Sequence, residues 1–169
     1  MIILMNSSKT LNFERPAHIS KHTIPEFLDD SQRLVARLQK LSVSDFSRLM
    51  AVSEKLADLN VKRYRNWSTS LEGSDAKQAL LAFKGDIYAA MDADRYKIND
   101  FDFAQKHLRI LSGLYGVLRP LDLIQPYRLE MAAKLRTDRG PDLYRFWGRR
   151  INTALNEFIK HEKSGVVIN

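Results

Sequence analysis

Two short apolar runs stand at opposite ends of the chain, and they constrain its fold more than any other feature. Residues 2–5 and 166–168 are rich in Ile or Val and are typical of buried strands, whereas the pattern between them is mostly helical. An apolar strand at the end of a chain needs a partner and some cover. Either the two runs pair with each other, or the natural chain continues past Asn169 and supplies the missing neighbours.

Helical periodicity dominates most of the remaining sequence. It predicts helices over 25–41, 44–59, 74–90, 99–111 and 142–159, the second capped by Ser44 and the last by Asp142. Residues 11–24 and 60–73 are expected to be an irregular connection and a loop. Apolar residues make up 44% of the chain, enough for a sizeable core. We therefore expect one α+β domain over 1–169, a mixed α/β arrangement with a helix-rich N-terminal part.

Composition excludes several classes of protein. The chain has no cysteine, which rules out disulfides, thiolate metal sites and Cys nucleophiles. No apolar run approaches the roughly 20 residues that cross a bilayer, and the first residues lack the basic start of a signal peptide. A cytoplasmic protein without a membrane partner is the prediction. His18, His22, His107 and His161 show no metal-ligand pattern, so we predict no metal and no cofactor.

The positive charge is concentrated in one stretch. The net charge is +7, and residues 103–150 alone hold 10 Lys or Arg against 4 Asp or Glu. A local basic excess is typical of a protein that binds a polyanion, and it also occurs on ordinary solvated surfaces. Within this stretch, residues 111–120 read Leu-Ser-Gly-Leu-Tyr-Gly-Val-Leu-Arg-Pro.

Glycines at 113 and 116 would let a backbone come close to a phosphate, as in a helix-hairpin-helix unit. The other interpretation is a helix C-cap followed by a turn. In the first case, flanking cations would add phosphate contacts that position DNA without reading its sequence. We expect those cations to share one surface around the bend; they are Lys106, Arg109, Arg119 and Arg128.

A second candidate is a phosphate-binding cleft. Ser7-Ser8-Lys9-Thr10 follows a strand but lacks the glycines of a phosphate loop, so Lys9 would act as a point charge or simply lie exposed. Lys84 stands beside Gly85, and Tyr127, Arg128 and Glu130 could line a polar cleft or form an internal Arg–Glu pair. Trp67 could stack on an unpaired base or anchor its loop.

Several blocks of the sequence resemble the YaaA family of peroxide stress proteins. They are residues 101–131, Phe83-Lys84-Gly85-Asp86 with Tyr88, Leu143-Tyr144-Arg145-Phe146-Trp147-Gly148, and the opening strand with Lys9-Thr10-Leu11. One departure is Asn6-Ser7-Ser8, where the family usually has Ser-Pro-Ala; the lost proline frees the backbone there. Family members continue past a Val-Val-Ile-Asn stretch, so the resemblance implies that the domain is incomplete at its C-terminal end.

The resemblance also implies a function. Members are bacterial, cytosolic proteins that bind DNA and limit the damage that unincorporated iron causes with hydrogen peroxide. Their fold is unusual, with a basic cleft and a helix-hairpin-helix element, which the motif match assigns to Gly113, Leu114, Tyr115 and Gly116.

The prediction is a monomeric DNA-binding protein of the peroxide response, with little sequence preference for duplex or distorted duplex. The alternative is an enzyme acting on a nucleotide or modified base, with Lys9, Thr10, Lys84 and Tyr127 in a phosphate-binding cleft; no nucleophile–base pair is recognisable. A third possibility is a partner-binding module without nucleic acid.

Overall fold

A four-stranded sheet lies at the centre of the molecule. The computed structural model describes residues 1–71, 75–160 and 166–169. The strand order is β6 (Gly116–Leu118), β5 (Leu108–Ser112), β1 (Ile2–Asn6) and β8 (Val167–Ile168). β1 runs parallel to β5 and to β8, and β5 forms an antiparallel hairpin with β6. The pairing of the two chain ends, one of the two alternatives that the sequence left open, is present, since Ile2 lies opposite Val167.

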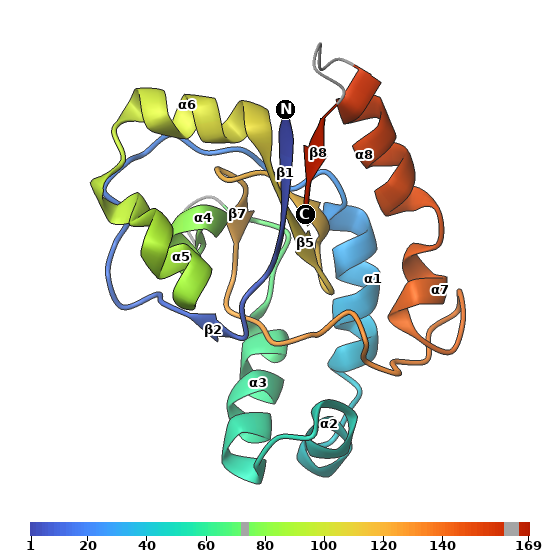
Figure 1. The fold of residues 1–169 in the computed structure, drawn as a ribbon. Coiled ribbons are helices and arrows are strands. Elements are labelled where there is room, and N and C mark those ends of the chain that lie inside the picture. The colour runs from blue at the N-terminus through green and yellow to red at the C-terminus, as the bar shows by residue number, and fades with distance from the viewer. Residues whose placement is uncertain (72–74, 161–165) are drawn as a thin grey trace.

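Helices pack on both sides of this sheet. Figure 1 shows α4 (Ala79–Ala82), α5 (Asp86–Met91) and α6 (Ile98–His107) on one side of β1. The other side carries α1 (Leu28–Leu38), α7 (Leu143–Trp147) and α8 (Arg150–Lys160). The largest fully buried side chains include Trp147, Tyr64 and Tyr115, so aromatic rings fill much of the core. The predicted α+β class is confirmed.

The helix predicted over 44–59 is wrong, because two helices occupy this region. α2 (Val43–Met50) ends where Ala51 adopts a left-handed conformation, with φ 49°. α3 (Glu54–Asn66) then begins after Ser53, whose side chain caps it. Residues 60–66, predicted as loop, are therefore helical. Figure 1 places α2 and α3 beyond the end of the sheet.

The helix predicted over 74–90 is also wrong among its described residues; Ser74 lies outside them. The segment forms β3 (Lys77–Gln78), α4, β4 (Phe83–Lys84) and α5. Gly85, with φ 138°, breaks the helical path between β4 and α5. β4 pairs with β2 (Thr10–Leu11), and β3 pairs with β7 (Leu123–Ile124).

The remaining helices begin near the predicted positions but are shorter. α6 follows a 3-10 turn (Ala93–Arg95) and ends at His107, because residues 108–112 continue as strand β5. Asp142 caps α7 as predicted, accepting a hydrogen bond from the Arg145 N–H, but Gly148 separates α7 from α8. No helix in the described ranges has the length and apolar character needed to cross a membrane.

Candidate functional site

The double-glycine bend joins two strands, so the predicted helix-hairpin-helix at this position is wrong. Residues 113–115 connect β5 to β6, and Ser112 lies opposite Gly116. Gly116 has φ 69°, and a Cβ there would lie 2.9 Å from the Trp147 ring. The Trp147 indole N–H donates to the carbonyl of Gly113 at 3.0 Å. All four residues of the predicted motif are buried, and they form a strand connection in place of an exposed turn between two helices; they are Gly113, Leu114, Tyr115 and Gly116.

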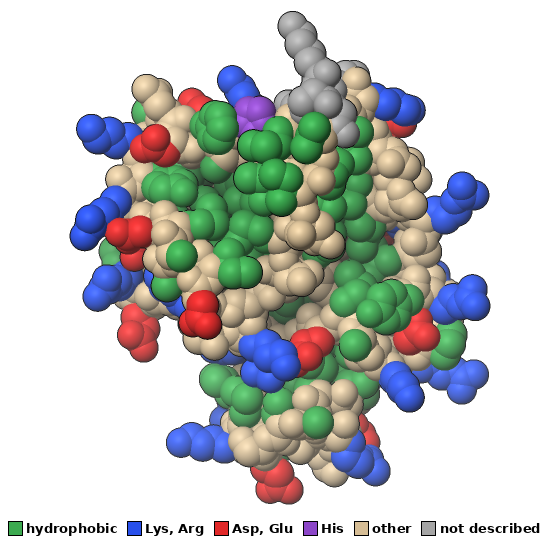
Figure 2. All heavy atoms as spheres, viewed as in Figure 1, with side chains coloured by type: hydrophobic (Ala, Val, Ile, Leu, Met, Phe, Trp, Pro, Cys, Tyr) green, Lys and Arg blue, Asp and Glu red, His purple; other side chains and the backbone are tan. Residues whose placement is uncertain are grey.

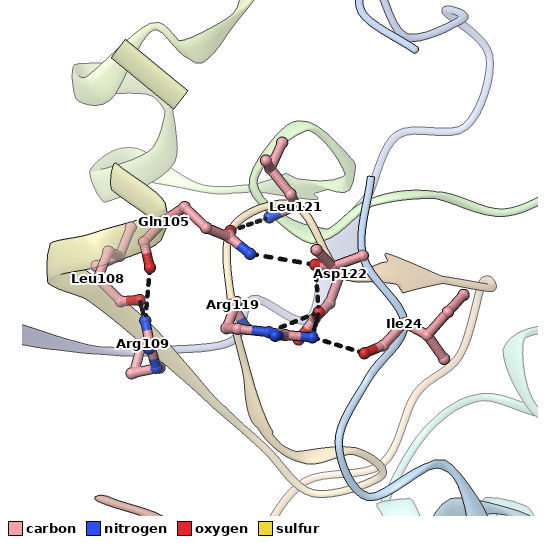
Figure 3. Close-up of polar contacts among 8 residues, drawn as sticks. Ile24, Gln105, Leu108, Arg109, Arg119, Leu121 and Asp122 are labelled. Atoms are coloured by element: carbon pink, nitrogen blue, oxygen red, sulfur yellow. Dashed lines mark hydrogen bonds and ion pairs between the residues drawn. The ribbon is translucent and has the colours of Figure 1, made fainter. Parts of the chain in front are cut away.

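Arg119, predicted as a phosphate contact, lies in a structural network (Figure 3). Its guanidinium donates to Oδ1 of Asp122 through Nε at 3.0 Å and Nη2 at 2.8 Å. Nη2 also donates to the Ile24 carbonyl at 2.7 Å. The Asp122 side chain is 1% exposed and accepts a further bond from the Thr23 hydroxyl. A buried carboxylate is stable only when such donors compensate its charge, so Arg119 has a structural role at Asp122.

Arg109 is similarly engaged. Its Nη1 donates to the carbonyls of Gln105 and Leu108, as Figure 3 shows, and its guanidinium carbon lies 3.4 Å from the centre of the Phe158 ring. Burial, together with the nearby charge of Arg119, lowers the pKa of Arg109 to about 10. This arginine packs between α8 and the sheet and lines a pocket together with Arg119.

The predicted single basic surface around the bend is wrong. Arg109 and Arg119 share one pocket, Lys106 is exposed on α6, and Arg128 lines a different cleft. Figure 2 shows basic side chains spread around the rim of the view, with acidic side chains among them. Sequence proximity therefore misled this prediction. The β5–β6 hairpin brings Arg109 and Arg119 to one pocket, but Lys106 lies on α6 and Arg128 lies beyond the hairpin at another cleft.

A cleft of about 460 Å³ lies where the parallel strands β1 and β5 end. The structure brings together here Lys9, Tyr127 and Arg128 of the predicted site. Glu130 stands between the two cations, with its carboxylate oxygens 3.2 Å from Lys9 Nζ and 3.5 Å from Arg128 Nη2. The Arg–Glu pair considered from the sequence is thus present, and it sits at a cleft rather than inside the core.

The two other predicted members of this site lie outside the cleft lining. Thr10 and Lys84 face each other in the β2–β4 pair. Lys84 Nζ lies 3.5 Å from a carboxylate oxygen of Asp94, with which it forms an ion pair. The sequence did not suggest the pairing of β2 with β4, which places Lys84 opposite Thr10 instead of in the cleft lining.

The floor of the cleft includes Ser7 and Tyr127, which line it, and the Tyr127 hydroxyl is bonded to the buried Ser112. The Tyr127 hydroxyl lies 2.6 Å from Ser112 Oγ and also bonds to Ser7. Burial raises the pKa of Tyr127 strongly, so this phenol stays neutral at physiological pH. The Ser7 N–H donates to the Leu111 carbonyl at 2.9 Å, which ties the loop after β1 to the end of β5. The floor is therefore held by both strands.

A second basic feature is a shallow groove of about 580 Å³ between α1, α2 and residues 132–136. Four cations and one carboxylate line it: Arg37, Arg48, Lys134, Arg136 and Asp45. Arg37 Nε donates to the Arg136 carbonyl at 3.0 Å, which joins the two walls. Hydrogen bonds from Ser42 and Arg48 lower the pKa of Asp45. Lys134 and Arg136 are exposed, and the described residues include no acidic partner for either side chain.

A family model described as peroxide stress protein YaaA matches residues 1–169. The chain belongs to the YaaA family. The resemblance identified from the sequence is thereby confirmed, and the coarse functional assignment, a peroxide stress protein, follows from the family. Sequence reasoning about this YaaA-family chain missed Arg37 and Arg48 as possible binding residues. The sequence indicated this groove only in part. The basic stretch of residues 103–150 contains Lys134 and Arg136, but no sequence pattern predicted that α1 and α2 lie beside them.

The remaining candidate residues of this YaaA-family chain are Trp67 and the histidines, and those that the structure describes contact other parts of the protein. Trp67 is 8% exposed, and its indole N–H donates to the Tyr115 hydroxyl at 3.0 Å, so its ring is part of the core. His18 and His22 contact the backbone carbonyls of Tyr96 and Ser20. His161 lies outside the described residues. Among those described, no group of three or more His, Asp or Glu is arranged to hold a metal ion.

Proposed function

We propose that this YaaA-family protein binds DNA in the groove between α1, α2 and residues 132–136, and thereby limits iron-dependent damage to DNA during peroxide stress. The observation that carries the proposal is the lining of this groove, in which four cations face a single carboxylate. Two of the cations, Lys134 and Arg136, are exposed and lack acidic partners among the described residues, so they are available to phosphates.

The chemistry of the groove favours backbone contacts. Lys and Arg side chains bind phosphate oxygens and release condensed counterions, which gives affinity that falls steeply with salt. Such contacts position the protein on DNA without reading bases. Little sequence preference is therefore expected, and protein bound along the duplex would shield it from oxidants formed at free iron.

The test compares two double variants that remove equal charge. Lys134→Ala with Arg136→Ala removes two groove cations, and Lys97→Ala with Lys106→Ala removes two exposed cations at α6, which Figure 1 places at the opposite end from α2. Fluorescence anisotropy with labelled duplex, bubble and single-stranded DNA is measured at several salt concentrations. The groove variant should weaken binding to all sequences and lower the salt slope by about 2, whereas the α6 variant should change little.

Equal weakening by both variants, or an affinity independent of salt, would overturn the proposal. A second measurement addresses the stress function. Nicking of supercoiled plasmid by ferrous iron and peroxide should be slowed by the unmodified protein and by the α6 variant, and much less by the groove variant.

A further inference from the structure

We infer that the cleft at the ends of β1 and β5 is a separate binding site for a small phosphomonoester. Lys9 and Arg128 bind the phosphate of this ligand, and Tyr144 lies beside the remainder of the ligand. This goes beyond the proposed DNA binding, because none of these three residues lines the α1–α2 groove. Three features of the cleft support this site: the two cations around Glu130, the hydrogen-bonded floor and the partly apolar walls.

Glu130 occupies the position between the two cations without forming a close pair with either. Its oxygens lie 3.2 Å from Lys9 Nζ and 3.5 Å from Arg128 Nη2. Close charge-assisted hydrogen bonds of this kind are about 2.7–2.9 Å long. The two oxygens of the Glu130 carboxylate therefore reach both cations only at long distances. A phosphate monoester is larger and has three terminal oxygens, so it could contact both cations at once. Because the Glu130 side chain is 36% exposed, it can turn toward solvent when that anion arrives.

Arg128 has an unused donor. Its Nε is buried, and the described part of the chain offers it no hydrogen-bond partner. An unsatisfied buried N–H of a guanidinium is costly, and such groups mark places where an absent ligand completes the bonding. A phosphate contacted through the guanidinium fork would use Nε and Nη together, which is the bidentate geometry that arginine favours.

The floor of the cleft is rigid and neutral. Tyr127 is 5% exposed, and its hydroxyl bonds to Ser112 and Ser7, so the two strands and the loop before Lys9 are joined. Clefts at the carboxyl ends of parallel strands are common ligand positions in α/β proteins, because the loops that leave the strands converge there. Among the described residues that line the cleft, Glu130 is the one acidic side chain, so it is the main source of repulsion for an anion there.

The walls suggest what else the ligand carries. Tyr144 lines the cleft and is 64% exposed, and Met131 and Ala132 add apolar surface. A volume of about 460 Å³ lies within the 300–1,000 Å³ typical of small-molecule sites. A phosphate linked to a flat, partly apolar group, as in a nucleoside monophosphate, matches two cations at one end and an exposed aromatic ring nearby.

Isothermal titration calorimetry with the full chain tests the inference, using adenosine monophosphate, inorganic phosphate and adenosine. We expect saturable binding of the monophosphate, weaker binding of phosphate and none of adenosine. Lys9→Ala, at a side chain that is 61% exposed, should weaken monophosphate binding about tenfold. Arg128→Gln should weaken it further, and Glu130→Gln should strengthen it about tenfold, because the competing carboxylate charge is gone.

Three results would overturn the site. They are no saturable binding of either phosphate compound, binding that is unchanged in both Lys9→Ala and Glu130→Gln, and binding of adenosine that is as tight as binding of its monophosphate. If Arg128→Gln fails to fold, the other two variants still decide. The groove variant Lys134→Ala with Arg136→Ala is the matched control: it should keep monophosphate binding, while Lys9→Ala should keep duplex binding.

Discussion

At the scale of single residues, Gly113 sets how closely the β5–β6 hairpin and the segment of residues 127–131 approach. A Cβ at this position would lie 2.3 Å from the Leu129 carbonyl oxygen and 3.0 Å from the carbonyl carbon of Glu130. Both are backbone atoms, so no flexible side-chain end can move aside. The absence of a side chain at 113 therefore lets the segment that carries Arg128 and Glu130 lie against the hairpin.

Gly113→Ala is expected to destabilise the fold by about 2–3 kcal/mol, the cost of an extra carbon forced into a packed site. Urea unfolding followed by circular dichroism measures this loss. The variant should also weaken monophosphate binding, because the segment that forms one wall of the cleft must shift. Gly148→Ala serves as control: the nearest atom to its Cβ is 3.6 Å away, so any loss there comes from backbone strain and should leave the cleft intact. A change below 1 kcal/mol at position 113 would contradict this account.

Single residues were predictable where chemistry alone decides. The alternative phosphate-binding cleft was expected to contain Lys9, Thr10, Lys84 and Tyr127. Lys9 and Tyr127 do line one cleft, together with Arg128, whereas Thr10 and Lys84 do not. For Arg119, predicted as a phosphate contact, the sequence did not reveal the pairing with Asp122, whose carboxylate is buried only in the folded chain. A pattern of charges does not show which carboxylate becomes buried on folding. It therefore does not show which arginine pairs with that carboxylate and which stays available to a ligand.

At the scale of elements, the α2 helix depends on its first turn. The Ser42 hydroxyl accepts a hydrogen bond from the Asp45 N–H at 3.1 Å, and the Asp45 carboxylate accepts bonds from the Ser42 N–H and hydroxyl. This reciprocal cap satisfies donors that the helix itself cannot. It also orients Asp45 and Arg48 at the groove proposed for DNA.

Ser42→Ala should lower the free energy of unfolding by about 1 kcal/mol, the usual cost of losing a helix cap. Ser44→Ala is a matched control, because Ser44 is an exposed residue inside α2 and alanine has the higher helix propensity. Its effect should be close to zero. Chemical denaturation of both variants measures the free energy of unfolding. Equal losses in the two variants would show that Ser44, the cap predicted from the sequence, also stabilises α2.

Elements could be predicted where one periodicity persists over many residues, as in α1. Periodicity failed where a short strand follows a helix without a turn. Leu108, Ile110 and Ser112 are buried in alternation along β5, a period of two that five residues cannot distinguish from the end of α6. It also failed at Ala51, since no sequence rule requires that alanine to adopt a left-handed conformation.

At the scale of the whole molecule, buried tyrosines connect parts of the chain that are far apart in sequence. The Tyr64 hydroxyl on α3 donates to the Arg128 carbonyl at 2.8 Å, and the Tyr88 hydroxyl on α5 donates to the Asn6 carbonyl at 2.8 Å. Tyr115 and Tyr127 stack edge to face, with centroids 5.4 Å apart. The pairing of the chain ends was predictable from two apolar runs, but this aromatic core depends on long-range packing that local patterns do not encode.

These tyrosines make stability sensitive to alkaline pH. Burial raises the pKa of Tyr64, Tyr88 and Tyr127, and it raises the pKa of Tyr115 from 10.0 to about 12. Above pH 10 the unfolded chain loses phenolic protons that the folded chain keeps, so stability is complete below pH 10 and falls as pH rises. Tyr115 alone corresponds to about 3 kcal/mol lost by pH 12. Burial lowers the pKa of Lys77 and Arg109, which acts in the opposite direction and offsets part of the loss.

Tyr88→Phe separates this effect from general alkaline damage. At pH 7 the variant should be about 1 kcal/mol less stable, because it loses the hydrogen bond to the Asn6 carbonyl. Between pH 9 and about 11.5 its stability should fall less steeply than that of the unmodified chain, because one phenol no longer titrates on unfolding. Urea denaturation across this range measures both slopes. Parallel slopes would mean that Tyr88 is already ionised or exposed in the folded protein, which its 7% exposure argues against.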